Sequence, residues 1–507
     1  MKFGRILLAL VAVAAVVGLV VWFPGSSEPE PSALDRPVVA AAVADQAVSA
    51  TWYCAAATAG PGEPFAHRII ITNPTDRNLP VRVSPVGPTG PVPSKMFLVP
   101  AHGPFVVDVD REFAAPGLSA SVESPSGQIV VEHRLTAINQ EDQVPCATAT
   151  SDRWWFPALD SARGATAKVT LFNPFPGDAG VDIEVILDAS ARTPAELSGI
   201  VVPARSSRVV DLGAVVQRRD LFAVVVRARS GRLIAETTQT FDGSTGVVGL
   251  RMNVGMATES PRWVLPGGFT GQGVAESLVV VNPTDQRISA EVRVIPFAGA
   301  STAPEPIVLD LPALRYAVVD LSAESRVPPV GYHAISVATD GAPVVVARLN
   351  SVTGPPAAAP APADGAPATA VRPAVTSGVA ISTGSPVMAG DWLVPAIDAG
   401  ANPAPVVFVH NPSSTAAQIS TVPVDPDLGA DAVAAATSTI EVAAGDSVAL
   451  TVPPSTRPGT SVGLRITSMT PIVVERLVTY PTENELAMGL AVPFRTPQSG
   501  PVPLPGR

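Results

Sequence analysis

The stretch "WVLPGGFTGQGVAESLVVVNP", from Trp263 to Pro283, begins with the pattern W-x-x-P and ends with Asn-Pro. The same frame runs from Trp154 to Asn173 and from Trp392 to Asn411, and the spacing from tryptophan to asparagine is 19 residues in each copy. A frame that recurs at a fixed spacing indicates a repeated structural unit, whereas a catalytic motif rarely occurs three times in one chain.

Two further landmarks follow the first in the same order. "VPAHGPFVVDVD" begins at Val99 and recurs from Val202, from Leu311 and, in a weaker form, from Val442. A third pattern is found as "GQIVVEHRL", "GRLIAETTQ", "APVVVARLN" and "TPIVVERLV". These landmarks predict four units, of which the first is divergent because Trp52 lies 21 residues before Asn73 and lacks the W-x-x-P proline.

Each unit reads as a series of short valine-rich strands separated by turn residues. Seven or eight such strands in roughly 100 residues favour a two-sheet sandwich, and they are too many for one propeller blade. We therefore predict an all-β fold, with an N-terminal transmembrane helix followed by four tandem immunoglobulin-like β-sandwich repeats. The expected repeats are 46–150, 151–258, 259–388 and 389–495, with a disordered Pro/Ala-rich loop at 354–378 and a disordered tail at 496–507. The short joints between them favour a stiff rod or a tightly stacked array.

The N-terminus carries an apolar run from Ile6 to Phe23, preceded by Lys2 and Arg5. Eighteen helical residues span ~27 Å, close to the thickness of the hydrocarbon core of a membrane. Residues 1–25 are therefore expected to be a single-pass anchor with its N-terminus in the cytoplasm, followed by a linker at 26–45, so that the bulk of the chain lies outside the cytoplasm. The alternative is a cleaved signal peptide, which would make the protein secreted.

The chain has two cysteines, Cys54 and Cys146, which are expected on the opening and closing strands of the first unit. An even pair outside the cytoplasm predicts a disulfide bond. Two buried free thiols, or a bridge between two copies of the protein, remain the alternatives.

The recurring residues are predicted to be structural. Asparagine before proline leaves the helical region, and its side chain can bond nearby backbone, so Asn73, Asn173, Asn282 and Asn411 are expected to end strands and close turns. The tryptophans Trp154, Trp263 and Trp392 are expected to fill one end of each sandwich core. Asp108, Asp211 and Asp320 should cap turns. The adjacent pair Trp154 and Trp155 is also a candidate exposed binding surface.

No catalytic, metal-binding or cofactor-binding constellation stands out. The five histidines are scattered and form no zinc motif. Glu132, Glu236 and Glu475 recur at one strand position close to arginines, which is typical of structural ion pairs. A net charge of −11 excludes a general nucleic-acid binder, because no basic stripe is available for phosphates.

The single anchor, the repeated W-x-x-P, Asn-Pro and V-V-D-L landmarks and the arginine-rich, lysine-poor composition resemble an uncharacterised family of secreted actinobacterial envelope proteins, domain of unknown function 5719. The resemblance covers nearly all of the chain after residue 45, and it implies an envelope protein without an established activity. Two hypotheses follow: a non-enzymatic scaffold or binding module for a cell-wall glycan or an envelope protein, or a hydrolase of an envelope polymer with acidic residues on loops of one unit.

Overall fold

The computed structural model describes residues 49–494 except 61, 126, 298–303, 355–375, 399–404, 453–460 and 481–484. The predicted anchor, the linker, the tail and most of the predicted Pro/Ala-rich loop lie outside the described residues. Within the described part of the chain, no helix is long and apolar enough to cross a membrane.

The described chain is almost entirely β-structure, which confirms the predicted all-β class. Unit 1 contains β1 (Ala50–Cys54), β2 (Ala66–Asn73), β3 (Leu79–Gly87), β4 (Gly90–Pro91), β5 (Lys95–Val99), β6 (Gly103–Asp108), α2 (Val109–Phe113), β7 (Ser119–Ser124), β8 (Val130–Ala137) and β9 (Gln140–Pro145). Unit 2 contains β10 (Arg153–Leu159), β11 (Ala165–Asn173), β12 (Ala179–Ile186), β13 (Ala191–Arg192), η2 (Ala195–Leu197), β14 (Ile200–Val202), β15 (Ser206–Asp211), α3 (Leu212–Val215), β16 (Phe222–Ser230), β17 (Ile234–Asp242) and β18 (Val248–Val254).

Units 3 and 4 repeat this succession with fewer short elements. Unit 3 contains β19 (Arg262–Thr270), β20 (Val274–Val281), β21 (Ile288–Pro296), β22 (Ile307–Leu311), β23 (Tyr316–Asp320), β24 (Gly331–Thr339), β25 (Val345–Thr353) and β26 (Ser377–Thr383). Unit 4 contains β27 (Ala389–Asp398), β28 (Val406–His410), β29 (Ala417–Val424), α4 (Ala430–Ala436), β30 (Ser438–Val442), β31 (Ser447–Thr451), β32 (Ser461–Tyr480), β33 (Glu485–Leu490) and β34 (Val492–Pro493). The long strand β32 pairs with strands of both sheets of its unit.

Each unit is a sandwich of two sheets, with its first strand in one sheet and its second strand in the other. In unit 2 the first sheet has the order β10-β16-β12-β13, with β14 also paired to β12, and the second has the order β15-β11-β17-β18. All of these pairs are antiparallel. The first two strands of an immunoglobulin constant domain are neighbours in one sheet, whereas here they lie in different sheets, so the predicted immunoglobulin-like character of the repeats is not confirmed.

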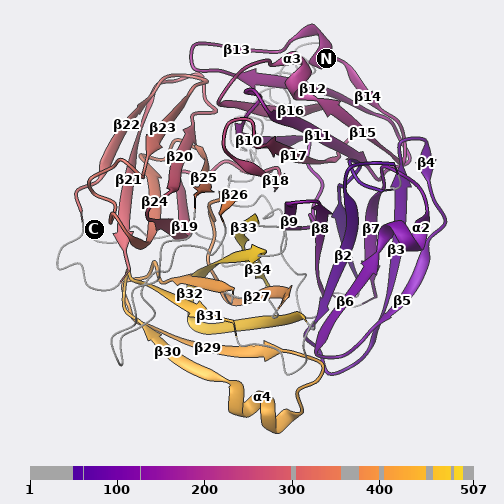
Figure 1. The fold of residues 1–507 in the computed structure, drawn as a ribbon, viewed down its shortest axis with the longest axis vertical. Coiled ribbons are helices and arrows are strands. Elements are labelled where there is room, and N and C mark those ends of the chain that lie inside the picture. The colour runs from indigo at the N-terminus through magenta and orange to yellow at the C-terminus, as the bar shows by residue number, and fades with distance from the viewer. Residues whose placement is uncertain are drawn as a thin grey trace, which may run out of the picture.

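The four units form a closed ring. Figure 1 shows the chain passing around a centre from unit 1 to unit 4, which returns to lie beside unit 1. The last strand of each second sheet lies at this centre, where β9 contacts β18 and β33, and β26 contacts the same two strands. These four strands are called the closing strands below. The four units are thus packed against one another, as expected of a stacked array, but they are arranged in a ring. The alternative expectation of a stiff rod is wrong.

The hydrophobic cores continue from one unit into the next. The core of unit 1 includes Leu393, Val424, Val492 and Phe494 of unit 4. Likewise, the core of unit 3 includes Trp155 and Met256 of unit 2. Both faces of each second sheet are therefore covered, one within its own sandwich and one by a neighbour, and such sheets can carry apolar residues on both faces.

The predicted disulfide between Cys54 and Cys146 is present and joins β1 to the residue that follows β9, with 4.6 Å between the Cα atoms. In unit 2, Phe156 and Gly255 occupy the same two positions, and a Cβ atom on Gly255 would lie 2.7 Å from the Phe156 ring. The bridge in unit 1 therefore replaces a close contact between an aromatic ring and a glycine.

Candidate functional site

The recurring asparagines hold the two sheets of each unit together. In unit 3, Asn282 Nδ2 donates to the carbonyl oxygens of Gln286, Leu311 and Pro312 at 2.7, 3.0 and 3.0 Å, and its Oδ1 accepts from the Thr284 amide at 2.9 Å. The same bonds recur at Asn73, Asn173 and Asn411. The side chain thus closes the expected turn and also joins the first landmark to the second, which sequence reasoning had not connected.

The recurring tryptophans are buried and hydrogen-bonded. Trp154, Trp263 and Trp392 donate from Nε1 to the carbonyl oxygens of Leu233, Val344 and Ile472 at 3.0, 2.9 and 3.0 Å. This agrees with the predicted packing role.

The proposed surface of Trp154 and Trp155 is wrong, because both side chains are at most 1% exposed. Trp155 points to the opposite face of β10, where it packs in the core of unit 3 and donates to Glu259 at 2.7 Å.

The recurring aspartates cap turns, as predicted. Asp108 accepts from the Arg111 amide at 3.1 Å, and Asp211 accepts from the Ala214 amide at 3.0 Å. Asp320 accepts from two amides, at Ser322 and Ala323. Each of these carboxylates satisfies backbone donors just after a strand, which is a structural role.

A buried polar contact recurs at three of the four junctions between units. The third landmark has an acid position, which holds Glu132, Glu236 and Glu475 in units 1, 2 and 4, and a following position, which holds His133 in unit 1, Arg348 in unit 3 and Arg476 in unit 4. The following residue of one unit bonds the acid of the next: His133 to Glu236 at 2.9 Å, Arg348 to Glu475 at 2.6 Å and Arg476 to Glu132 at 2.8 Å. We call these contacts the junction pairs.

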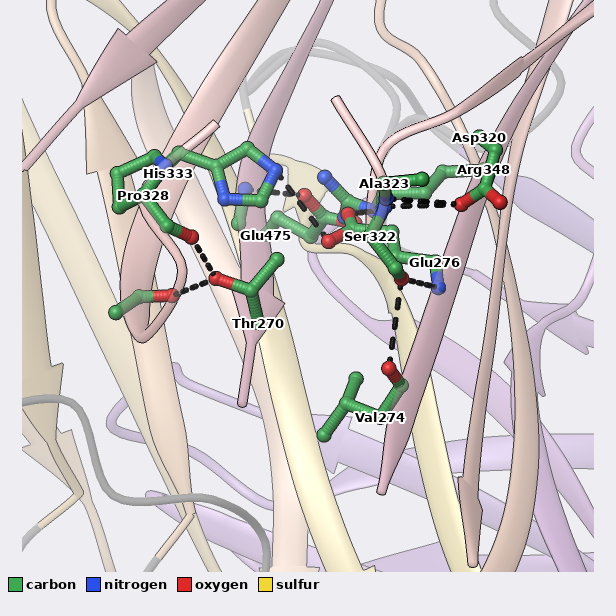
Figure 2. A network of polar contacts seen from close by, with 12 residues as sticks. Thr270, Val274, Glu276, Asp320, Ser322, Ala323, Pro328, His333, Arg348 and Glu475 are labelled. Atoms are coloured by element: carbon green, nitrogen blue, oxygen red, sulfur yellow. Dashed lines mark hydrogen bonds and ion pairs between the residues drawn. The ribbon is translucent and has the colours of Figure 1, made fainter. Parts of the chain in front are cut away.

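The junction pair between units 3 and 4 is the centre of a larger network. Arg348 forms ion pairs with both Glu475 and Glu276, and Glu276 in turn lies 3.3 Å from His333 (Figure 2). Glu475 also accepts from the Gly267 amide at 2.7 Å and from the Ser382 hydroxyl. Arg348, Glu475, Glu276 and His333 are all fully buried, and Arg348 forms ion pairs with both glutamates, so its charge is compensated inside the protein.

The junction pair between units 4 and 1 closes the ring. Glu132 accepts from Arg476 and also from the Gln143 side chain, and Arg476 donates to the Gln143 carbonyl at 3.3 Å. Nearby, the Thr72 hydroxyl accepts from the Ala396 amide at 3.3 Å. The two bonds of Arg476 and the bond between Ala396 and Thr72 each connect residues more than 320 positions apart in the sequence.

The junction between units 2 and 3 has no such pair. The acid position of unit 3 is Ala347, and the following position of unit 2 is Thr237. Both members are absent together, as expected if each requires the other, because an isolated buried charge is strongly unfavourable. The predicted link between these acids and arginines is correct in kind, but the partners come from different units. The sequence offered one sign of this pairing between units: the acid of unit 3 and the basic residue of unit 2 are missing together.

Two further carboxylates lie among the closing strands. Glu485 accepts from the amides of Leu250, Val379 and Leu486 at 2.6, 2.7 and 3.1 Å, and so bonds the unpaired edges of β18 and β26. Gly249 and Gly378 face this carboxylate, and a Cβ atom on Gly249 would lie 2.3 Å from one of its oxygens. Burial raises the pKa of Glu485 well above its usual value.

Asp142 has the corresponding role between β9 and β18. Its side chain accepts from the amides of Met252 and Gln143 at 2.7 and 2.8 Å. Burial raises the pKa of Asp142 to about 7, although the two amides and Arg476 act in the opposite direction. The two acids supply acceptors to strand edges that have no neighbouring strand there.

One end of the centre contains an apolar cavity with a volume of about 120 Å³. All four units contribute to its wall, with Val144, Met252, Trp263, Trp392 and Met488 among the lining residues. Among the described residues, no group of three or more histidine, cysteine, aspartate or glutamate side chains could hold a metal ion. What the arrangement supplies chemically is a set of carboxylates that accept hydrogen bonds inside the ring.

The sequence matches the model of one protein family over residues 143–453, which is more than half of the chain, and that family is described as a family of unknown function, DUF5719. No curated protein matches the sequence.

Solved structures align only weakly. A Thermotoga maritima protein designated 1070 aligns with 25% of this chain and 93% of its own length, at 14% identity and a TM-score of 0.18. A trypsin-activated alpha-2-macroglobulin from Escherichia coli covers 91% of this chain and 31% of its own length, at 13% identity and a TM-score of 0.11. The tetra-tandem repeat of a large adhesion protein covers 84% and 95%, at 11% identity and a TM-score of 0.11. TM-scores this low do not indicate a common fold.

Proposed function

The chain belongs to this family of unknown function, and we propose that it is a non-enzymatic binding scaffold of the cell envelope. In this proposal residues 1–25 anchor the protein in the membrane, and the ring lies outside the cytoplasm, where it recognises a cell-wall glycan. The proposed disposition is supported by the apolar run from Ile6 to Phe23 and by the disulfide between Cys54 and Cys146, which suits an oxidising compartment.

The proposal that the protein is not an enzyme rests on one observation: the recurring glutamates are buried and bonded between units. Glu132, Glu236 and Glu475 are at most 1% exposed, and each bonds a neighbouring unit. A glycosidase of the usual kind needs two carboxyl groups that flank a bond of the substrate. Acids that are enclosed at junctions instead stabilise one arrangement of the four units, as a rigid binding surface requires.

The test uses the full chain, purified in detergent, and insoluble cell-wall material from the source organism. We expect the wall material to retain the protein at physiological salt and to release no soluble fragments during prolonged incubation. Retention is measured by sedimentation, and fragments by mass spectrometry of the supernatant. An absence of retention would contradict the binding role, and a steady release of fragments would replace the scaffold with a hydrolase.

The location is tested separately in intact cells. Protease added from outside should digest the ring while a cytoplasmic control protein survives. Protection of the ring until the membrane is permeabilised would contradict an extracytoplasmic position.

A further inference from the structure

A polar cavity lies at the junction between units 2 and 3, the junction without a buried pair. Its volume is about 170 Å³, and its wall includes Asp160, Asp220 and Arg251 of unit 2 and Ser277 and Ser351 of unit 3. Asp220 is exposed, Asp160 and the two serines are partly buried, and Arg251 is buried. The cavity therefore leads from solvent at Asp220 to a guanidinium in its interior.

Arg251 differs from the other buried arginines that face a neighbouring unit. Arg348 and Arg476 each pair with a glutamate, whereas Arg251 forms no ion pair with any described residue. Its side chain is 8% exposed, Nη2 makes one long bond of 3.4 Å to the Asn350 carbonyl, and Nε has no hydrogen-bond partner. Burial lowers the pKa of Arg251 to about 10, so that it remains charged at neutral pH.

An unpaired buried guanidinium is costly unless something accepts its hydrogen bonds. The guanidinium carbon of Arg251 lies 4.8 Å from the centre of the Phe241 ring, which supports the group but offers no acceptor to its Nε–H. A buried donor beside a cavity that the fold leaves without an acceptor, as it leaves the Nε–H of Arg251, is the feature expected of a ligand site.

The absence of a buried junction pair between units 2 and 3 is consistent with a ligand site there. Ala347 lies two residues before Leu349, which lines the cavity, and residues two apart on a strand share a face. A glutamate at position 347, as in the other units, would bring a carboxylate to the face that borders the cavity. The coupled loss at Thr237 and Ala347 thus removes a charged contact at the junction that contains the cavity.

The chemistry of the wall selects the ligand. Arg251 offers donors, the carboxylates of Asp160 and Asp220 accept, and serine hydroxyls can do both. Two aspartates and one arginine leave a formal charge of about −1, which disfavours anions. A hydroxyl group both donates and accepts, so that a neutral polyol satisfies the whole wall. The volume lies below the ~300 Å³ of sites for drug-sized ligands, as expected for a single ring.

We propose that this cavity binds one sugar ring of a neutral glycan, with Arg251 and the two aspartates as its hydrogen-bonding groups. The inference rests on the proposed role as a glycan-binding scaffold and names the site where a sugar would be recognised. Because one ring fills the cavity, a free monosaccharide should bind weakly, and a wall polymer should gain strength from repeated sites and from contacts outside the cavity.

The experiment measures saturation-transfer NMR on the full chain in detergent. The probes are D-glucose, D-galactose, D-mannose, D-arabinose and N-acetylglucosamine, with D-glucuronate as the anionic comparison. We expect transfer to at least one neutral sugar, with a dissociation constant on the order of millimolar, and weaker transfer to glucuronate. The variants are Asp220→Ala, at an exposed position that the fold tolerates, and Arg251→Met, with Asp285→Ala on the surface of unit 3 as the matched control.

Asp220→Ala and Arg251→Met should each weaken binding by about tenfold or more, as expected for the loss of a charge-assisted hydrogen bond, while Asp285→Ala should leave it unchanged. If no neutral sugar binds, or if Asp220→Ala binds as the unchanged protein does, the assignment is wrong. Retention on wall material distinguishes the two proposals: retention without sugar binding overturns only this site, and the loss of both overturns the scaffold as well.

Discussion

Arg476 in unit 4 and Glu132 in unit 1 form a buried ion pair of 2.8 Å, although 344 residues separate them in the sequence. This contact repeats, between the last unit and the first, the bond that Arg348 makes to Glu475 and that His133 makes to Glu236. The same residue positions therefore join consecutive units and close the ring, so that the closing junction is an ordinary junction of the repeat.

Replacing Arg476 by leucine should lower the free energy of unfolding by about 3–5 kcal/mol, because it leaves the Glu132 carboxylate buried without its cation. The double variant Arg476→Leu with Glu132→Leu should lose much less than the sum of the two single changes. Denaturant unfolding of the four proteins measures this coupling. The exposed pair of Arg287 and Asp310 is the control and should contribute less than about 1 kcal/mol. Additive effects at positions 476 and 132 would show that the ion pair does not stabilise the ring.

Replacing Asn282 by alanine should cost about 2–4 kcal/mol, because three backbone carbonyls lose their donor and two of them belong to the other landmark. The equivalent change at Asn173 should cost a similar amount, since its bonds are the same. Thermal and denaturant unfolding would measure both. Gln272→Ala, at an exposed position, serves as the control and should have an effect within about 0.5 kcal/mol. A neutral result at Asn282 would remove the asparagine from the structural account.

Replacing Gly267 by alanine should destabilise the contact between units 3 and 4. A Cβ atom there would lie 1.8 Å from a Phe408 ring carbon, so the ring must move, at a cost of about 1–3 kcal/mol or more. Adding Phe408→Leu should recover part of that loss. The matched control is Gly177→Ala, where a Cβ atom would meet nothing within 4 Å. Equal stability of the two glycine variants would contradict the close approach.

The Asp142 carboxyl predicts how stability depends on pH. Its pKa is about 7 in the folded chain and near 3.8 when unfolded, so the folded state holds the proton more tightly between these values. The contribution of this group is therefore most favourable below about pH 4 and falls by about 4 kcal/mol as pH rises to 7. An asparagine side chain cannot ionise, so Asp142→Asn should gain stability relative to the unchanged protein between pH 5 and pH 8.

That gain is measured by urea unfolding of both proteins at the two pH values, so that groups common to both cancel. Asp285→Asn on the surface should show a constant difference. If Asp142→Asn loses the same amount at pH 5 and at pH 8, the carboxyl does not titrate in the assigned range.

Removing the disulfide should cost about 4 kcal/mol. The bridge closes a loop with a sequence separation of 92, and cross-linking such a loop lowers the entropy of the unfolded chain. Cys54→Ala with Cys146→Ala tests this by denaturant unfolding. The variant Cys54→Phe with Cys146→Gly, which copies Phe156 and Gly255 of unit 2, should retain more stability than the alanine pair. Peptide mapping without reductant should recover the two cysteines as one linked fragment, and separate alkylatable peptides would disprove the bond.

Local signals in the sequence were sufficient for the strands, the asparagine turns and the disulfide. Asn-Pro restricts the backbone wherever it occurs, so the asparagine turns could be predicted from a few residues. Cys54 and Cys146 lie near the two ends of one unit, so the disulfide could be predicted without knowing how the units pack.

The contacts between units were not predictable in the same way. Trp155 follows Trp154 and points to the other face of β10, and that face could be judged exposed or covered only once unit 3 was placed against it. The junction pairs escaped for the same reason, since a pattern within one unit does not show which acid meets which base. Arg251 carries no signal at all in the sequence, because a lone arginine on a closing strand is indistinguishable from one that is paired.

The shared core of units 1 and 4 constrains the order of events during synthesis. Val492 and Phe494 are the last described residues of the chain and complete the apolar core around Trp52 and Ile71. A ribosome makes Trp52 more than 400 residues earlier, so unit 1 keeps an uncovered apolar face while nearly all of the chain emerges. Such a face is open to aggregation until its cover arrives. Unit 1, the first part of the ring to be made, is therefore also the part whose apolar face stays uncovered for the longest time during synthesis.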